Sequence, residues 1–240
     1  MNIKNAKGDN MEEKWDERTE ILIGRENINK LNKSKVIIYG IGGVGSFATE
    51  GLARAGVGNI VLVDNDIVSI TNLNRQIHSN ITTIGKDKVE VMKERILQIN
   101  PKCNVEIYNP TKIDVEEENL IDESMTYVVD AIDTFSQKIK IILKAHEKGI
   151  PIISGTSAGN KMNPNLFQVS DIYNTSVCPV CRLLRKELKK NGIKKHKVIY
   201  SKEEPIRNKE RMQNIGSISF VPSIMGLMIA GEVIKEIINK

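Results

Sequence analysis

Aromatic residues, cysteines and long apolar runs are all scarce in this sequence. Only 4% of the 240 residues are aromatic whereas 40% are hydrophobic, so we expect one α/β unit with an aliphatic core. The three cysteines are too few, and odd in number, for a disulfide framework, and they suit a reducing compartment. No apolar run reaches the roughly 18 residues of a membrane span, and no signal peptide opens the chain. These absences argue against a secreted or membrane protein and favour a cytoplasmic one.

The stretch 35–64 carries the clearest functional signal. The apolar run 35–39 predicts a buried strand, and a helical pattern follows at 47–55. The turn between them has the spacing G-x-G-x-x-G, which lets backbone N–H groups approach a phosphate at the helix N-terminus. Its glycines are Gly40, Gly42, Gly43 and Gly45. A second apolar run ends in Asp64, about 20 residues further on, where such folds place an acid on a ribose. The combination predicts a nucleotide site rather than a plain strand–helix turn.

Strands and helices alternate over most of the chain, which predicts a doubly wound, mostly parallel, Rossmann-like α/β sheet. We expect strands at 35–39, 59–63, 105–108, 126–129 and 150–154, and helices at 18–24, 26–31, 47–55, 85–100, 115–121 and 135–148. After residue 155 the pattern weakens into a C-terminal extension of short strands at 166–169 and 198–200, helices at 181–190 and 221–238, and a polar loop at 205–214. We divide the chain into a disordered tail at 1–14, a nucleotide-binding domain with an N-terminal arm at 15–155, and a substrate-binding and dimerisation part at 156–240 of the same globular unit.

Polar residues follow several of these strands, at the edge where the carboxyl ends of a parallel sheet border one crevice. They are Asp66, Asn72, Arg75, Gln76, Lys88 and Asp133. Cations for phosphates and a carboxylate for Mg²⁺ are what a nucleoside triphosphate requires, and they exceed what a dinucleotide requires. The sequence therefore favours ATP with Mg²⁺. An NAD-dependent oxidoreductase and a non-catalytic nucleotide-binding module stay open as alternatives.

Taken together, these motifs resemble the ubiquitin-activating-enzyme-like adenylyltransferases. The resemblance implies that the glycine turn and Asp64 hold the adenosine end of ATP, and that Asp133 binds Mg²⁺. It implies phosphate contacts from Asn72, Arg75 and Lys88. It also implies a homodimer, because Arg18 matches an arginine that reaches the phosphates of the partner subunit. The catalytic residues implied in this way are Arg18, Arg75, Lys88 and Asp133.

Within that family, the chain is similar to a branch of tRNA-modifying dehydratases. The segments that carry this similarity are 18–24, 71–78, 89–96, 98–101, 170–175, 197–205, 216–217 and 220–222. The resemblance implies ATP-dependent cyclisation of threonylcarbamoyladenosine beside the tRNA anticodon. A carboxylate would be adenylated, and an oxygen already in the substrate would then displace AMP and close an oxazolone ring. The implied partners are tRNA and a sulfur-relay protein. The alternative within the family is activation of the C-terminus of a ubiquitin-like sulfur-carrier protein.

One segment of the chain is strongly basic. Residues 182–211 hold twelve Lys and Arg but four Asp and Glu, so the rest of this +5 chain is slightly acidic. In the helix predicted at 181–190, basic residues recur at helical spacing opposite Leu184 and Leu188. Such a stripe suits the phosphates of tRNA, and the alternative is a solvated, lysine-rich surface. The residues that we assign to nucleic-acid binding are Arg182, Arg185, Lys186, Lys189, Lys190, Lys194, Lys195 and Lys197.

Cys178 and Cys181 form a CxxC whose role the sequence leaves open. Tetrahedral zinc needs four ligands, and no second cysteine pair precedes the last helix. A redox pair and a nucleophilic Cys178 are the other functional interpretations, and we favour small buried thiols at a helix start. We expect His78 to pack or hydrogen-bond rather than catalyse, and His196 to lie in a surface run that could touch phosphate.

Overall fold

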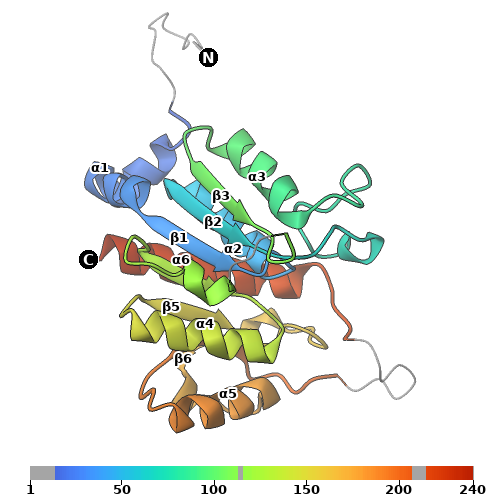
Figure 1. Cartoon of the computed structure of the whole chain (residues 1–240). Helices are drawn as coiled ribbons and strands as arrows, with labels where there is room; N and C mark the ends of the chain where they lie inside the picture. The colour runs from blue at the N-terminus through green and yellow to red at the C-terminus, as the bar shows by residue number, and fades with distance from the viewer. Residues whose placement is uncertain (1–13, 113–115, 207–214, 240) are drawn as a thin grey trace, which may run out of the picture.

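The computed structural model describes residues 14–112, 116–206 and 215–239, and its centre is a seven-stranded sheet (Figure 1). The strand order is β3-β2-β1-β4-β5-β7-β6, and every neighbouring pair is parallel except β6 with β7. The strands are β1 (Lys35–Tyr39), β2 (Asn59–Val63), β3 (Asn104–Tyr108), β4 (Tyr127–Asp130), β5 (Ile152–Gly155), β6 (Phe167–Asp171) and β7 (Lys197–Ser201). The predicted doubly wound α/β fold is confirmed. The tail predicted at 1–14 and the loop predicted at 205–214 fall almost wholly outside the described residues.

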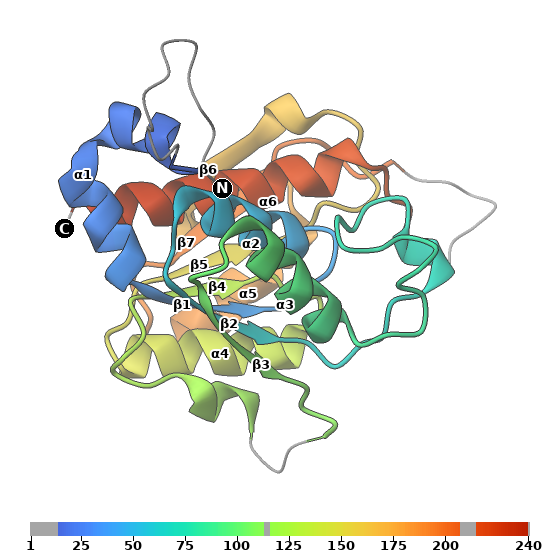
Figure 2. The same cartoon turned by 90° about the horizontal axis from the view of Figure 1, so that it is seen from above.

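Helices cover both faces of this sheet (Figure 2). Alternate side chains of β1 enter opposite cores: Val36 and Ile38 face one, and Ile37 and Tyr39 face the other. The first core is closed by α1, α2, α3 and α6, and the second by α4 and α5. The bounds are α1 (Glu17–Lys33), α2 (Gly45–Ala55), α3 (Lys88–Ile99), α4 (Phe135–Glu147), α5 (Pro179–Lys190) and α6 (Phe220–Ile238). None of the helices that the structure describes is long and apolar enough to cross a membrane.

Two glycines explain where the predicted helix boundaries hold and where they shift. Gly24, at φ +80°, breaks α1 into the two helical pieces expected at 18–24 and 26–31. Gly85 has φ +85°, a left-handed conformation that a helix interior does not accept, so α3 begins at Lys88 and not at 85. Lys88 is therefore the first residue of its helix, at the sheet edge. The helix predicted at 115–121 is a 3₁₀ turn, η2 (Glu117–Leu120), within the described residues.

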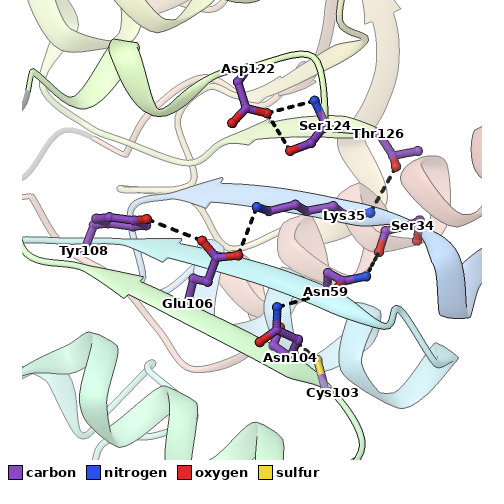
Figure 3. Close-up of polar contacts among 10 residues, drawn as sticks. All are labelled: Ser34, Lys35, Asn59, Cys103, Asn104, Glu106, Tyr108, Asp122, Ser124 and Thr126. Carbon is purple, nitrogen blue, oxygen red and sulfur yellow. Dashed lines mark hydrogen bonds and ion pairs between the residues drawn. The ribbon is translucent and has the colours of Figure 1, made fainter.

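At the opposite end of the sheet, where β1 and β2 begin, polar side chains link the strands to one another (Figure 3). The Lys35 ammonium reaches Glu106 at 2.9 Å, and the Thr126 hydroxyl accepts the Lys35 backbone N–H at 3.0 Å. The Asn59 amide donates to the carbonyl of Ser34 at 3.2 Å. These contacts lie at and beyond the amino ends of β1 and β2, which leaves the carboxyl edge free for a ligand.

Candidate active site

The glycine turn lies where the sheet changes winding direction, between β1 and β4. Gly40 has φ +84°, and a Cβ there would lie 2.7 Å from the carbonyl oxygen of Ala131, just after β4. A Cβ on Gly45 would lie 1.7 Å from the carbonyl oxygen of Gly40, so only glycine lets α2 start so close to β1. Helix α6 supports the turn from outside, because a Cβ on Gly226 would lie 2.2 Å from the carbonyl oxygen of Val44. The backbone of the turn is thus held rigidly beside the α2 N-terminus.

A cavity of about 590 Å³ opens at this switch point. Every residue predicted to contact the nucleotide of its own chain lines it, except Gly45. The lining residues from that prediction are Gly40, Gly42, Gly43, Asp64, Asp66, Asn72, Arg75, Gln76, Lys88 and Asp133. Gly45 instead serves the close packing of α2 on β1, which is a structural requirement of the turn.

The acids at the end of β2 have different environments. Asp64 accepts the backbone N–H of Ile41 at 2.5 Å and that of Asp66 at 2.8 Å, so it joins β2 to the glycine turn. Burial raises the pKa of Asp64, although the Lys88 ammonium and the two N–H groups oppose that shift. Asp66 is exposed and pairs with the Lys88 ammonium at 2.5 Å. The Lys88 side chain is only 4% exposed. Its ammonium group is held at the cavity by the ion pair with this carboxylate.

The loop after Asp66 delivers three further polar side chains. Asn72 is buried, and its side-chain oxygen accepts the N–H of Ser69 at 2.9 Å, which fixes the short turn η1 (Ile70–Asn72). The Arg75 guanidinium donates to the carbonyl of Thr71 at 2.8 Å, which leaves further N–H donors for an anion. Gln76 is buried with its side-chain oxygen unpartnered, an acceptor on the cavity wall that a ligand donor could satisfy.

The far half of the cavity was not predicted from the sequence. It is lined by the small residues of the segment 156–159 and by two apolar residues and a serine near α6: Thr156, Ser157, Ala158, Gly159, Ile215, Ser217 and Pro222. Asn160, which has φ +55°, links the two chain segments of this wall. Its backbone N–H donates to the Gly216 carbonyl at 2.8 Å, and its side-chain oxygen accepts the Gly216 N–H at 2.7 Å. Its carbonyl also accepts the N–H of Ile206 at 2.7 Å. The sequence signals for this wall were a run of small residues after a predicted strand and the segments 216–217 and 220–222, which carry the family similarity.

A buried ion pair supports both halves of the cavity. The Lys138 ammonium donates to the two carboxylate oxygens of Asp130 at 2.8 and 2.7 Å, and to the carbonyl of Gly155 at 3.0 Å. Both side chains are almost fully buried; Lys138 lies on α4, Asp130 ends β4 and Gly155 ends β5. Lys138 therefore fixes the spacing of the two strands whose following residues, Ala131 and Thr156, line the cavity.

Comparison with known proteins agrees with this geometry. The sequence pattern of the ThiF family matches residues 17–240. The chain belongs to the ThiF family.

Several relatives of the chain carry one specific name. The tRNA threonylcarbamoyladenosine dehydratase of Bacillus subtilis is 41% identical over 238 residues, which cover 92% of this chain and 94% of that protein. The Escherichia coli protein of the same name is 38% identical over 178 residues, covering 73% of this chain and 66% of that protein. A crystal structure of the E. coli dehydratase in complex with ATP has a TM-score of 0.84 and 30% identity, covering 99% of this chain and 97% of that one.

The remaining predicted residues of this ThiF-family chain lie away from the cavity. Arg18 is exposed in the first turn of α1 and does not line the cavity of its own chain. The basic stripe on α5 is narrower than predicted. Arg185 donates to the carbonyls of Ile172 and Thr175, and Lys197 pairs with Glu236. The stripe residues that remain exposed are Arg182, Lys186, Lys189, Lys190, Lys194 and Lys195.

The histidines follow the expectation in one case and not in the other. His196 is 2% exposed and hydrogen-bonds the Ser154 hydroxyl at 2.9 Å, so the prediction of a surface residue that touches phosphate was wrong. Its position at the entrance to β7 buries it despite the lysines on either side. His78 is also buried, consistent with packing rather than catalysis, and burial followed by the Lys88 charge lowers its pKa to about 4.

All three cysteines of the chain are free and buried. Cys178 and Cys181 lie at the start of α5, as the favoured interpretation expected. The described part of the chain holds no group of three or more His, Cys, Asp or Glu side chains placed to bind a metal ion. A four-ligand zinc site therefore has no support among these residues.

Proposed function

We propose that this chain is an ATP-dependent dehydratase that cyclises threonylcarbamoyladenosine beside the anticodon of tRNA. The observation that carries the proposal is the cavity at the sheet switch point, where a glycine turn, Arg75 and Lys88 converge. Its support is the 41% identity, over nearly the full length, to a B. subtilis protein that bears this name. The ATP complex of the E. coli dehydratase supports ATP as the nucleotide.

The first chemical step is adenylation. A carboxylate oxygen of the threonyl unit attacks the α-phosphorus of ATP, the bond to the β-phosphate breaks, and pyrophosphate leaves. Backbone N–H groups at the α2 N-terminus suit the phosphates, and the Arg75 and Lys88 charges stabilise the developing negative charge. Lys88 exchanges its contact with the exposed Asp66 for a phosphate oxygen, so Asp66 holds the ammonium in place before ATP binds.

Asp133 suits a magnesium ion that accompanies ATP. Its carboxylate lines the cavity after β4 and is exposed, and carboxylate oxygen is the hard ligand that Mg²⁺ prefers. When bound, Mg²⁺ supplies charge neutralisation for the departing pyrophosphate.

The second step is ring closure within the substrate. An oxygen of the ureido group attacks the activated carboxyl carbon, AMP leaves with the carboxylate oxygen, and the oxazolone ring loses a proton. Holding nucleophile and electrophile in one molecule provides a large effective concentration, so no enzyme nucleophile is needed. The small, weakly polar far wall from Thr156 to Gly159 offers room for the nucleoside and few groups that could hydrolyse the adenylate.

The partners follow from the same proposal. The exposed lysines of α5 bind the tRNA backbone, and Arg18 completes the ATP site of the second subunit in a homodimer. A sulfur-relay protein stays a prediction that rests on the family resemblance alone. The division at residue 155 is likewise a proposal about roles, since β7 and β6 join the same sheet as the nucleotide-binding strands.

Mass spectrometry of nucleosides tests the function directly. We expect tRNA that carries threonylcarbamoyladenosine to lose one water per modified nucleoside when it is incubated with the protein, ATP and Mg²⁺, with release of AMP. Pyrophosphate exchange that depends on a sulfur-carrier protein and ignores this tRNA would favour the alternative adenylyltransferase. A chain that neither releases AMP nor exchanges pyrophosphate with either substrate would overturn the proposal.

Substitutions in the phosphate half of the cavity test the assignment of residues. We expect Arg75→Ala and Lys88→Ala each to lower kcat by about 100-fold or more, because each removes a charge that stabilises the transition state. Lys102→Ala, which removes an exposed charge just before β3, serves as the matched control. Circular dichroism and the melting temperature check that the fold is retained. Turnover equal to wild type in either cavity variant contradicts the assignment.

A further inference from the structure

The CxxC at the start of α5 is not used by the proposed reaction. Cys178 is the N-cap residue of α5 and Cys181 lies in its first turn, so both thiols are on the side of the helix start that faces the core. They are 4% and 1% exposed. The N-cap residue and the third residue of a helix lie about one turn apart on the same face, so the two cysteines are neighbours in space as well as in sequence.

The surroundings of the pair favour a thiolate at Cys178. The neighbouring Cys181 thiol and the N–H groups of the first turn of α5 lower the pKa of Cys178, against the effect of burial. The neighbouring Cys178 and burial raise the pKa of Cys181. One nucleophilic sulfur beside one protonated sulfur is the arrangement that disulfide formation within a CxxC requires.

The backbone next to Cys178 is strained. Val177 has φ +63°, a left-handed conformation that a β-branched residue rarely adopts. Its side chain is half exposed, so this turn forms the outer cover of a buried thiol. A strained and exposed cover opens more readily than regular structure, which gives a small oxidant a route to Cys178.

The pair also contacts the cavity. The Cys178 sulfur lies 3.9 Å from the Thr156 hydroxyl oxygen, and Thr156 lines the far half of the cavity. The Thr156 hydroxyl donates in turn to the carbonyl of Ile199 at 3.1 Å. A change in the bonding of Cys178 therefore acts on a residue of the substrate wall.

We propose that Cys178 and Cys181 form a redox-active dithiol, which hydrogen peroxide closes to an intramolecular disulfide and which thereby changes the substrate half of the cavity through Thr156. The Cys178 thiolate attacks one peroxide oxygen, becomes a sulfenic acid and releases hydroxide. The Cys181 thiol then attacks that sulfur, the S–S bond forms, and water leaves. The two sulfurs lose two electrons in total, and peroxide accepts them. A dithiol reductant reverses the step.

Cys103 provides an internal control for the chemistry. It lies just before β3 (Figure 3). Its thiol donates to the carbonyl of Val57 at 3.5 Å, and burial raises its pKa to about 11. No second cysteine accompanies it in the sequence segment 101–108. A thiol that is protonated and isolated reacts slowly with peroxide.

Thiol counting on the full-length chain tests the dithiol. We expect mild peroxide to leave one of the three thiols titratable and to lower the mass of the chain by two hydrogen atoms. Peptide mapping should locate the disulfide in the segment 178–181. Cys103→Ser should lose both remaining thiols as wild type does. In Cys181→Ser, a sulfenic acid at Cys178 should be captured by dimedone. Three free thiols after treatment, oxidation of Cys103 at the same rate, or disulfides between chains instead of within one would each overturn the proposal.

The link to the cavity has its own readout, which rests on the proposed function. We expect the oxidised protein to turn over tRNA about fivefold more slowly, with recovery in dithiothreitol and no response in Cys178→Ser. A disulfide that forms without changing turnover refutes the link through Thr156. A reduced protein that never turns over tRNA refutes the proposed function instead, while the thiol count still decides the dithiol.

Discussion

At the scale of single residues, burial decides roles that sequence position alone does not reveal. His196 stands between lysines in the sequence, yet its ring lies among Ser154 and His146 in the second core. The main cause of its pKa of about 3 is burial, with smaller effects from the His146 and Lys138 charges. A histidine that stays neutral in the folded state makes stability depend on pH.

We predict that the free energy of unfolding falls as the pH is lowered from 7 toward 4. A histidine in the unfolded chain takes up a proton near pH 6.5 whereas His196 in the native state does so only near pH 3, so the unfolded state gains protons first. The slope reaches at most about 1.4 kcal/mol per pH unit for each such histidine, and His78 adds to it in part of the range. Urea unfolding at several pH values measures the slope. His196→Gln keeps a donor and an acceptor near Ser154 and should flatten it; an unchanged slope would refute the role of His196.

The cavity wall gives a second prediction at this scale. The Asn160 side chain accepts from Gly216, which lies between the lining residues Ile215 and Ser217, and its left-handed backbone suits asparagine or glycine. We expect Asn160→Gly to keep the backbone geometry and lose only that hydrogen bond, raising the KM for tRNA about fivefold, the equivalent of one hydrogen bond. Asn160→Ala should raise it further, because it adds backbone strain. Steady-state kinetics with tRNA varied at saturating ATP measures both. A larger effect on the KM for ATP than for tRNA would contradict this placement.

At the scale of elements, α5 combines two functions on opposite sides. Leu184 and Leu188 are buried in the second core, whereas Lys189 and Lys190 are exposed at its C-terminal end. Arg185 belongs to the packing side, since it donates to the carbonyls of Ile172 and Thr175. The helical period located this stripe from the sequence, but the partners of Arg185 are 10 and 13 residues away in a folded turn that the period does not describe.

We predict that reversing the charge of Lys189 and Lys190 weakens tRNA binding selectively. Lys189→Glu with Lys190→Glu should raise the KM for tRNA about tenfold at physiological salt and reduce the salt dependence of binding, because phosphate contacts release counterions. The KM for ATP should not change, since both residues lie outside the cavity. Lys33→Glu with Lys102→Glu, an equal charge change at exposed sites elsewhere, is the matched control. Equal effects of the two double variants would mean that α5 contributes only general charge.

At the scale of the whole molecule, the sequence predicted those features of the fold and the cavity that depend on short-range sequence patterns. The strands 35–39 and 59–63 were predicted with the bounds that the structure shows, because continuous apolar runs between turns are typical of buried parallel strands. The half of the cavity beside the glycine turn was predicted from the glycine spacing and from the charged residues after β2 and β4. The far half was not, because its small residues carry no charge pattern and Asn160 meets Gly216 across 56 positions of sequence. Such long-range contacts become visible only in the folded chain.

The predicted homodimer can be tested by mixing two inactive variants. Arg18 lies outside the cavity of its own chain, so if it serves the partner, Arg18→Ala and Lys88→Ala damage the site through different subunits. In a mixed dimer, one of the two sites then has an intact Lys88 from the first variant and an intact Arg18 from the second. Random exchange at equal amounts should restore about a quarter of wild-type turnover, the statistical share of intact sites in a two-fold dimer.

A second mixture supplies the control. Arg75→Ala and Lys88→Ala both damage the cavity of the chain that carries them, so no exchange of subunits creates an intact site, and turnover should stay at the level of the single variants. Restoration in the Arg18 mixture but not in this one is the pattern that only action between subunits produces. If neither mixture recovers while native mass spectrometry shows that the variants have exchanged into mixed dimers, Arg18 acts within its own chain or not at all, and the second subunit has no part in the chemistry.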